Sequence, residues 1–148
     1  MRRIASVLIV LSSLAFAPAP VYRAKPETRT DLEQMQETWV RVSIMVDGKR
    51  HEKAVGRSVV TIKGDTMSFG GPTDTWRFTL DATTSPKRIN FYRLEATPDP
   101  VFVGIYQLEG DRLVICWRMS ESESDRPASF DPAVQPKVWL HAYERKKP

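Results

Sequence analysis

The stretch that most constrains the fold is Val101–Trp117, where two apolar runs flank a short turn. The runs Val101–Leu108 and Leu113–Trp117 are rich in Val, Ile, Phe, Tyr and Trp, residue types that suit a pleated, half-buried surface. A short gap containing glycine between two such runs is typical of a β-hairpin. Both predicted strands are apolar on both faces. We therefore expect this hairpin at the centre of a sheet, covered on both sides or curled into a barrel.

Further segments with strand-like alternation occur along the rest of the chain. Turn signals separate them, among them Asp47-Gly48 and Gly64-Asp65. Eight strands at short spacing predict an all-β fold, either an antiparallel sandwich or an up-and-down barrel, and we expect the eight-stranded barrel. The predicted strands are Trp39–Val46, Val59–Lys63, Thr66–Phe69, Thr75–Leu80, Arg88–Arg93, Val101–Leu108, Leu113–Trp117 and Lys137–Arg145.

A short helix is expected just before the first strand. Thr30 and Glu33 have the spacing of a capping box. In this motif the side chain of each residue accepts a hydrogen bond from the backbone N–H of the other. Leu32 and Met35 are three residues apart and share one face of such a helix. We expect the helix to lay this apolar edge over one end of the barrel.

The start of the chain has the pattern of an export signal. Arg2 and Arg3 precede the apolar run Ile4–Ala17, as in a secretory signal peptide. We expect residues 1–19 to be a signal peptide, 20–29 a proline-rich linker and 30–148 the barrel domain. The protein is then exported, to the periplasm, the cell surface or the extracellular space, with no membrane span once the leader is removed. An uncleaved N-terminal anchor is the alternative, because a proline follows each A-x-A-like cleavage site.

Charge argues against nucleic acid as a partner. The formal net charge of the 148 residues is +4, but three of the 22 basic residues lie in the first 24 positions, where there is no acidic residue. A nucleic-acid-binding domain needs a basic stripe on its folded part, and the nearly neutral remainder shows none. With 41% hydrophobic residues, the chain can form one domain with a substantial core.

The sequence carries no motif for catalysis or metal binding. It lacks G-x-S-x-G, a phosphate-binding loop, a dinucleotide fingerprint, H-E-x-x-H and C-x-x-C. His51 and His141 are far apart, and the single cysteine, Cys116, is expected as a small buried residue on a core strand. We therefore expect no enzymatic activity, no cofactor and no metal.

Several short motifs together resemble a family of small, exported, lipocalin-like domains of uncharacterised function, expanded in planctomycetes. The resemblance covers about residues 31–146 and implies a lipocalin-like barrel, without a known activity or an established site. The motifs that carry it, in this order, are Asp31–Trp39 (DLEQMQETW), Val46–Lys49 (VDGK), Ile62–Asp65 (IKGD), Gly104–Leu113 (GIYQLEGDRL) and Arg126–Phe130 (RPASF).

The resemblance also implies a structural role for Trp39. Lipocalins pack an arginine over the Trp of the first strand at the closed end of the barrel, and Trp39 resembles that Trp. Arg126 or Arg145 would supply the cation in a cation–π contact. One departure is Glu37, because the family usually has glycine there, which eases the start of the first strand.

A ligand cavity is the functional expectation that remains, since apolar pockets with a few polar groups occur in the mouths of β-barrels. We expect non-enzymatic binding of a small apolar or amphipathic ligand in the barrel. The alternative is a structural or protein-interaction module whose core is filled with side chains. The predicted lining residues are Trp76, Phe78, Phe91, Phe102, Tyr106, Ile115 and Trp117, with Arg88, Arg77 or Tyr92 as a polar group near the mouth.

Overall fold

The strands lie where alternation and turn residues predict them. The computed structural model describes residues 29–51, 58–71, 73–95, 98–133 and 135–147, and the predicted leader and the linker up to residue 28 lie outside these ranges. The strands are β1 (Glu37–Val46), β2 (Lys49–Arg50), β3 (Val59–Lys63), β4 (Thr66–Phe69), β5 (Thr75–Asp81), β6 (Lys87–Tyr92), β7 (Phe102–Glu109), β8 (Arg112–Met119) and β9 (Trp139–Arg145).

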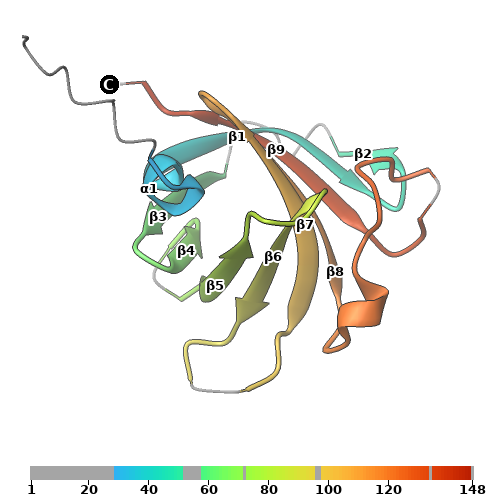
Figure 1. Ribbon diagram of the computed structural model, residues 1–148. Helices are drawn as coiled ribbons and strands as arrows, with labels where there is room; N and C mark the ends of the chain where they lie inside the picture. The colour runs from blue at the N-terminus through green and yellow to red at the C-terminus, as the bar shows by residue number, and fades with distance from the viewer. Residues whose placement is uncertain (1–28, 52–57, 72, 96–97, 134, 148) are drawn as a thin grey trace, which may run out of the picture.

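Eight of these strands close into an antiparallel barrel (Figure 1). From β3 to β9 each strand pairs with the next, and β1 pairs with both β3 and β9. The β1–β9 pairing runs from Trp39 opposite Arg145 to Val46 opposite Trp139. The short β2 only extends a hairpin at the end of β1. The predicted all-β barrel is confirmed, and its closure joins the two strands that a sandwich would leave as free edges.

The β7–β8 hairpin is covered on both faces, as its two apolar faces predict. Tyr106 and Ile115 lie opposite each other and belong to the core inside the barrel. Ile105 and Cys116 form the next pair and face outward, where they pack with Val138. Cys116 is fully buried, and this burial raises the pKa of its thiol to about 11. The thiol therefore stays protonated and packs as a small apolar group.

β1 does not keep the strict alternation that its sequence predicts. Its register against β9 shifts just after Arg41, which marks a β-bulge. Residues opposite each other share a face of the sheet. Arg41 lies opposite Tyr143, and Ile44 lies opposite His141, so all four residues face the interior. Val40, Val42, Ile44 and Val46 alternate with other residues in the sequence, which predicts that they share one face of the strand. This prediction is wrong, because the extra residue at the bulge reverses the alternation.

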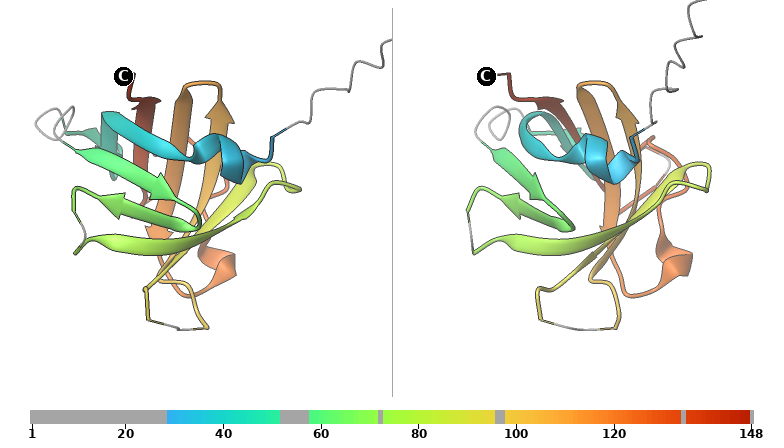
Figure 2. Two further views of the ribbon diagram at one scale, coloured as in Figure 1. Left: turned by 90° about the vertical axis from the view of Figure 1, so that its left-hand side faces the viewer. Right: turned by 60° about the vertical axis from the view of Figure 1, so that its left-hand side comes forward.

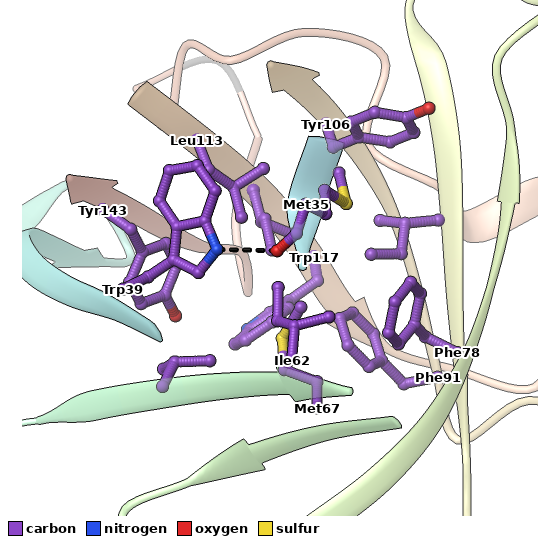
Figure 3. Packing of buried hydrophobic residues seen from close by; sticks show 13 residues of the cluster. Met35, Trp39, Ile62, Met67, Phe78, Phe91, Tyr106, Leu113, Trp117 and Tyr143 are labelled. Atoms are coloured by element: carbon purple, nitrogen blue, oxygen red, sulfur yellow. Dashed lines mark hydrogen bonds between the residues drawn. The ribbon is translucent and has the colours of Figure 1, made fainter. Parts of the chain in front are cut away.

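Side chains fill most of the barrel interior (Figure 3). Aromatic rings pack edge to face, for example Phe91 and Trp117, whose ring centres are 5.0 Å apart at an interplanar angle of 90°. This geometry adds a specific attraction to the burial of apolar area. The buried members of this core are Met35, Trp39, Val60, Ile62, Met67, Phe78, Ile89, Phe91, Tyr106, Leu113, Ile115, Trp117 and Tyr143.

The helix α1 (Asp31–Met35) lies across one end of the barrel (Figure 2). Its capping box is formed, because Thr30 Oγ1 accepts from the Glu33 N–H while the Glu33 carboxylate accepts from the Thr30 N–H. Met35 is fully buried below the helix, whereas Leu32 is 38% exposed. Among the described residues, no helix has the length and apolar character needed to cross a membrane.

Trp39 and Arg145 complete this closed end. The Trp39 indole N–H donates to the Met35 carbonyl at 2.8 Å (Figure 3). The Arg145 guanidinium carbon lies 4.4 Å from the centre of the Trp39 ring. Arg145 also donates to the carbonyls of Gln34 and Gln36, at the end of the helix. One arginine thus covers the ring and ties the last strand to the segment that caps the barrel.

Arg126, the other arginine predicted over Trp39, lies elsewhere. It sits on the outer surface, where it donates to the carbonyls of Ile89 and Gly104 and to Asn90 Oδ1. It also forms an ion pair with Glu123. Arg126 therefore holds the segment that follows β8 against β6 and β7. Of the two predicted arginines, Arg145 is the one that contacts the Trp39 ring.

Candidate functional site

A cavity of about 220 Å³ lies in the barrel at the end opposite α1. β4, β6 and β8 end there, and β5, β7 and β9 begin there. Asp74 is exposed, so the cavity reaches the protein surface at this residue. The residues that line it are Arg41, Phe69, Asp74, Trp76, Phe91, Phe102, Trp117, Trp139 and His141.

Four of the predicted aromatic residues, Trp76, Phe91, Phe102 and Trp117, line this cavity. The remaining predicted aromatic residues, Phe78 and Tyr106, face inward but are packed into the core away from it. For these two the predicted place in the lining is wrong. They point to the interior as expected, but they lie nearer the closed end, where neighbouring side chains fill the space.

The predicted polar group at the mouth is also wrong. Arg88 is exposed on the outer face of β6, because its neighbour Ile89 is in the core and side chains alternate along a strand. Arg77 and Tyr92 are on the outer face as well, where the Arg77 guanidinium lies 5.4 Å from the Tyr92 ring centre.

The polar groups of the cavity are instead Arg41, Asp74 and His141. A signal for Arg41 was present in the sequence, because Arg41 follows the core residue Trp39 by two positions and therefore shares its face. His141 likewise lies midway between Trp139 and Tyr143, which also face the interior. The sequence pattern left its direction open, and the pairing of β9 with β1 and β8 turns it inward.

His141 and Tyr143 form a buried polar pair at the side of the cavity. His141 Nδ1 and the Tyr143 hydroxyl oxygen are 2.8 Å apart and share a hydrogen bond. The His141 ring packs against Trp117 at 4.7 Å between ring centres. Burial, and to a smaller extent the charge of Arg41, lower the pKa of His141 to about 3. His141 is therefore neutral at physiological pH.

This burial predicts a dependence of stability on pH. The unfolded chain gains a proton at His141 as pH falls below about 6.5, whereas the folded protein does so only near pH 3. Stability therefore falls as pH is lowered through this window, by up to about 1.4 kcal/mol per pH unit. Urea denaturation at pH 6.5, 5.75 and 5.0 measures this slope.

Two variants separate the contribution of His141 from other groups. His141→Gln should be less stable at pH 7 but should show a flatter slope between pH 6.5 and 5.0. His51→Asn is the matched control, because His51 is exposed, and it should keep the wild-type slope. An unchanged slope in His141→Gln would show that other groups cause the pH dependence.

A second polar cluster lies at the closed end and has a structural arrangement. Asp31 Oδ2 accepts from Lys87 Nζ and from the Tyr106 hydroxyl, at 2.7 Å each. Burial alone would raise the pKa of the Asp31 carboxyl, but the bonds from Lys87 and Tyr106 outweigh it and the pKa is lowered. The cluster ties α1 to β6 and β7. Its donors are directed at one carboxylate rather than at a free space for a substrate.

Neither cluster has the composition of a metal centre. Within the described ranges, no three His, Cys, Asp or Glu side chains come together so that they could hold a metal ion.

Comparison with known proteins gives no match: no family model, no curated protein and no solved structure matches this chain. The geometry and chemistry of the cavity are therefore the features that point to a function.

Proposed function

We propose that this chain is an exported, non-enzymatic, lipocalin-like protein that binds one small, largely apolar ligand in the cavity opposite α1. The observation that carries the proposal is a cavity of about 220 Å³ with six aromatic rings in its wall, left in a barrel that is otherwise filled. Apolar cavities with a few polar groups are the usual form of small-molecule sites in barrels.

The closed end supports the same function. Met35, Trp39 and Arg145 block the barrel below α1, so a ligand would enter and leave on the side of Asp74. The export part of the proposal rests on Arg2 and Arg3 followed by the apolar run Ile4–Ala17. The lipocalin-like part rests on the resemblance of the motifs and on the arginine over the first-strand Trp.

The size of the cavity limits the ligand. Pockets for drug-sized ligands measure about 300–1,000 Å³, whereas an apolar cavity of about 150 Å³ holds one benzene molecule. The cavity of about 220 Å³ therefore suits a single ring with a short substituent.

The second candidate function is that of an interaction module with a filled core. It is favoured by two exposed apolar residues, Leu94 (56% exposed) and Met119 (64% exposed).

The four Trp indole N–H signals in a ¹H–¹⁵N NMR spectrum report directly on the cavity. Trp76, Trp117 and Trp139 line it, while Trp39 lies at the closed end. Titration with ethylbenzene should shift the signals of the three cavity residues and leave that of Trp39 in place. No saturable shift in the three cavity signals would contradict the proposed function and favour the interaction module.

A pair of variants provides the control. Phe102→Trp adds volume to the cavity wall and should abolish the ethylbenzene shifts. Tyr92→Trp adds an indole on the outer face of the same barrel, where Tyr92 contacts Arg77, and should leave binding intact. Equal loss of binding in both variants would mean that the effect does not arise in the cavity.

A further inference from the structure

One nitrogen of the His141 ring opens into the cavity. His141 is 6% exposed and forms part of the cavity wall. Its Nδ1 atom is held by the Tyr143 hydroxyl, whereas its Nε2 atom has no hydrogen-bond partner in the part of the chain that the structure describes. Trp117 Nε1 also lacks a partner but is completely covered by protein atoms, and His141 Nε2 is not covered in this way. Because the ring lies in the cavity wall, the accessible side of Nε2 faces the cavity.

The Tyr143 hydroxyl decides which nitrogen of His141 carries the proton. Tyr143 is fully buried, and burial raises the pKa of its hydroxyl, which therefore keeps its hydrogen. Among the described residues, His141 Nδ1 is the one hydrogen-bond partner of this hydroxyl, at 2.8 Å. If Nδ1 carried the proton, the Tyr143 O–H would be a buried donor without an acceptor, which is costly. The hydroxyl is therefore the donor and Nδ1 the acceptor.

This bond makes His141 Nε2 a donor that is open to the cavity. Burial lowers the pKa of His141, so the ring is neutral at physiological pH, and a neutral imidazole has one protonated and one unprotonated nitrogen. With Nδ1 unprotonated, the proton is on Nε2. Water in the cavity can accept from this N–H, but a ligand that displaces the water has to supply the acceptor itself. A ligand without one would leave a buried donor unpaired.

We infer that the cavity selects a small aromatic ketone or aldehyde, whose carbonyl oxygen accepts from the Nε2–H of His141. The inference rests on the proposed binding function and names the chemical class of its ligand. The ring of the ligand packs among the aromatic side chains of the wall. An uncharged carbonyl compound loses less hydration than an ion when it enters a mainly aromatic cavity. Tyr143 is a positioning residue, because it acts on the ligand only through the tautomer of His141.

The tautomer can be measured directly in the unmodified protein. In a long-range ¹H–¹⁵N NMR spectrum at pH 7, His141 Nδ1 should resonate as an unprotonated nitrogen and Nε2 as a protonated one. The variant His51→Asn retains a single histidine, His141, and therefore assigns the signals. Tyr143→Phe removes the donor to Nδ1, so both tautomers should become populated and the two nitrogen signals should move toward each other. A protonated Nδ1 in the unmodified protein would overturn the inference, because Nε2 would then be an acceptor.

Acetophenone and α-methylstyrene test the ligand class, because the two molecules have the same shape and differ only in a carbonyl oxygen in place of a methylene group. Their affinities are measured from the Trp indole signals. His141→Asn keeps an amide oxygen that can accept from Tyr143 but removes the donor to the cavity. It should lower the ratio of acetophenone to α-methylstyrene affinity about three- to tenfold, and the ratio cancels the change in cavity volume. His51→Asn makes the same change at an exposed position and should preserve the ratio.

The outcomes separate this inference from the function on which it rests. If both probes bind but His141→Asn leaves the affinity ratio unchanged, the cavity still binds ligands and the carbonyl selection is overturned. Thermal unfolding shows whether the barrel of this variant has formed. If it has not, Tyr143→Phe takes its place: it should lower the same ratio as Nε2 loses part of its proton, and an unchanged ratio would overturn the selection. If neither probe shifts the cavity Trp signals, the proposed function falls together with the inference.

Discussion

Replacing Trp39 with alanine should lower the free energy of unfolding by about 3–5 kcal/mol, as expected for a large aromatic residue removed from a core. Trp39 is fully buried and donates its indole N–H to the Met35 carbonyl at 2.8 Å. The Arg145 guanidinium, which covers the ring at 4.4 Å, would lose its aromatic partner. Urea denaturation at pH 7 measures the change.

Two comparisons test whether this loss comes from the closed end of the barrel. Trp39→Phe keeps a ring in place and removes the bond to Met35, so it should cost about 1–2 kcal/mol in addition to the lost volume. Trp139→Ala removes a half-buried Trp at the cavity rim and should cost much less than Trp39→Ala. Equal losses for Trp39 and Trp139 would contradict the assignment of Trp39 as the centre of the closed end.

The strands of this barrel could be predicted because their signals are local. Alternation over a few residues and glycines at positive φ, such as Gly64 and Gly110, mark where each strand ends. The sequence of the hairpin from Phe102 to Met119 also predicts burial on both sides, because both of its strands are apolar on both faces. Nothing beyond neighbouring residues is needed for these inferences.

The composition of the cavity could not be predicted in full, because it depends on pairings between distant strands. The bulge after Arg41 exists only against β9, about a hundred residues later in the chain, and it decides which residues of β1 beyond Arg41 face inward. The prediction of Arg88 as the polar group is wrong because alternation along β6 does not by itself tell which of the two neighbours, Arg88 or Ile89, enters the core. Phe78 and Tyr106 face inward as expected. Alternation shows which face of a strand a residue is on, but it does not show how far from the open end of the barrel the residue lies.

Gly104 explains how β7 and β8 come close enough to form the cavity wall. A Cβ at this position would lie 2.7 Å from the Cys116 carbonyl oxygen and 3.0 Å from the Trp117 Cβ. Because the nearest atom belongs to the backbone of β8, the two strands would have to move apart. We expect Gly104→Ala to lower the free energy of unfolding by about 2–3 kcal/mol through overpacking, measured by urea denaturation.

Gly71→Ala is the matched control, because a Cβ there meets nothing within 4 Å among the described residues and the backbone φ is not positive. It should change stability by less than about 0.5 kcal/mol. Gly104→Ala should also displace Trp117, and with it the ring that contacts both Phe91 and His141 in the cavity wall. Its ethylbenzene affinity should therefore fall while that of Gly71→Ala is kept. If Gly104→Ala is as stable as the wild type, the close approach of β7 and β8 cannot be what shapes the cavity.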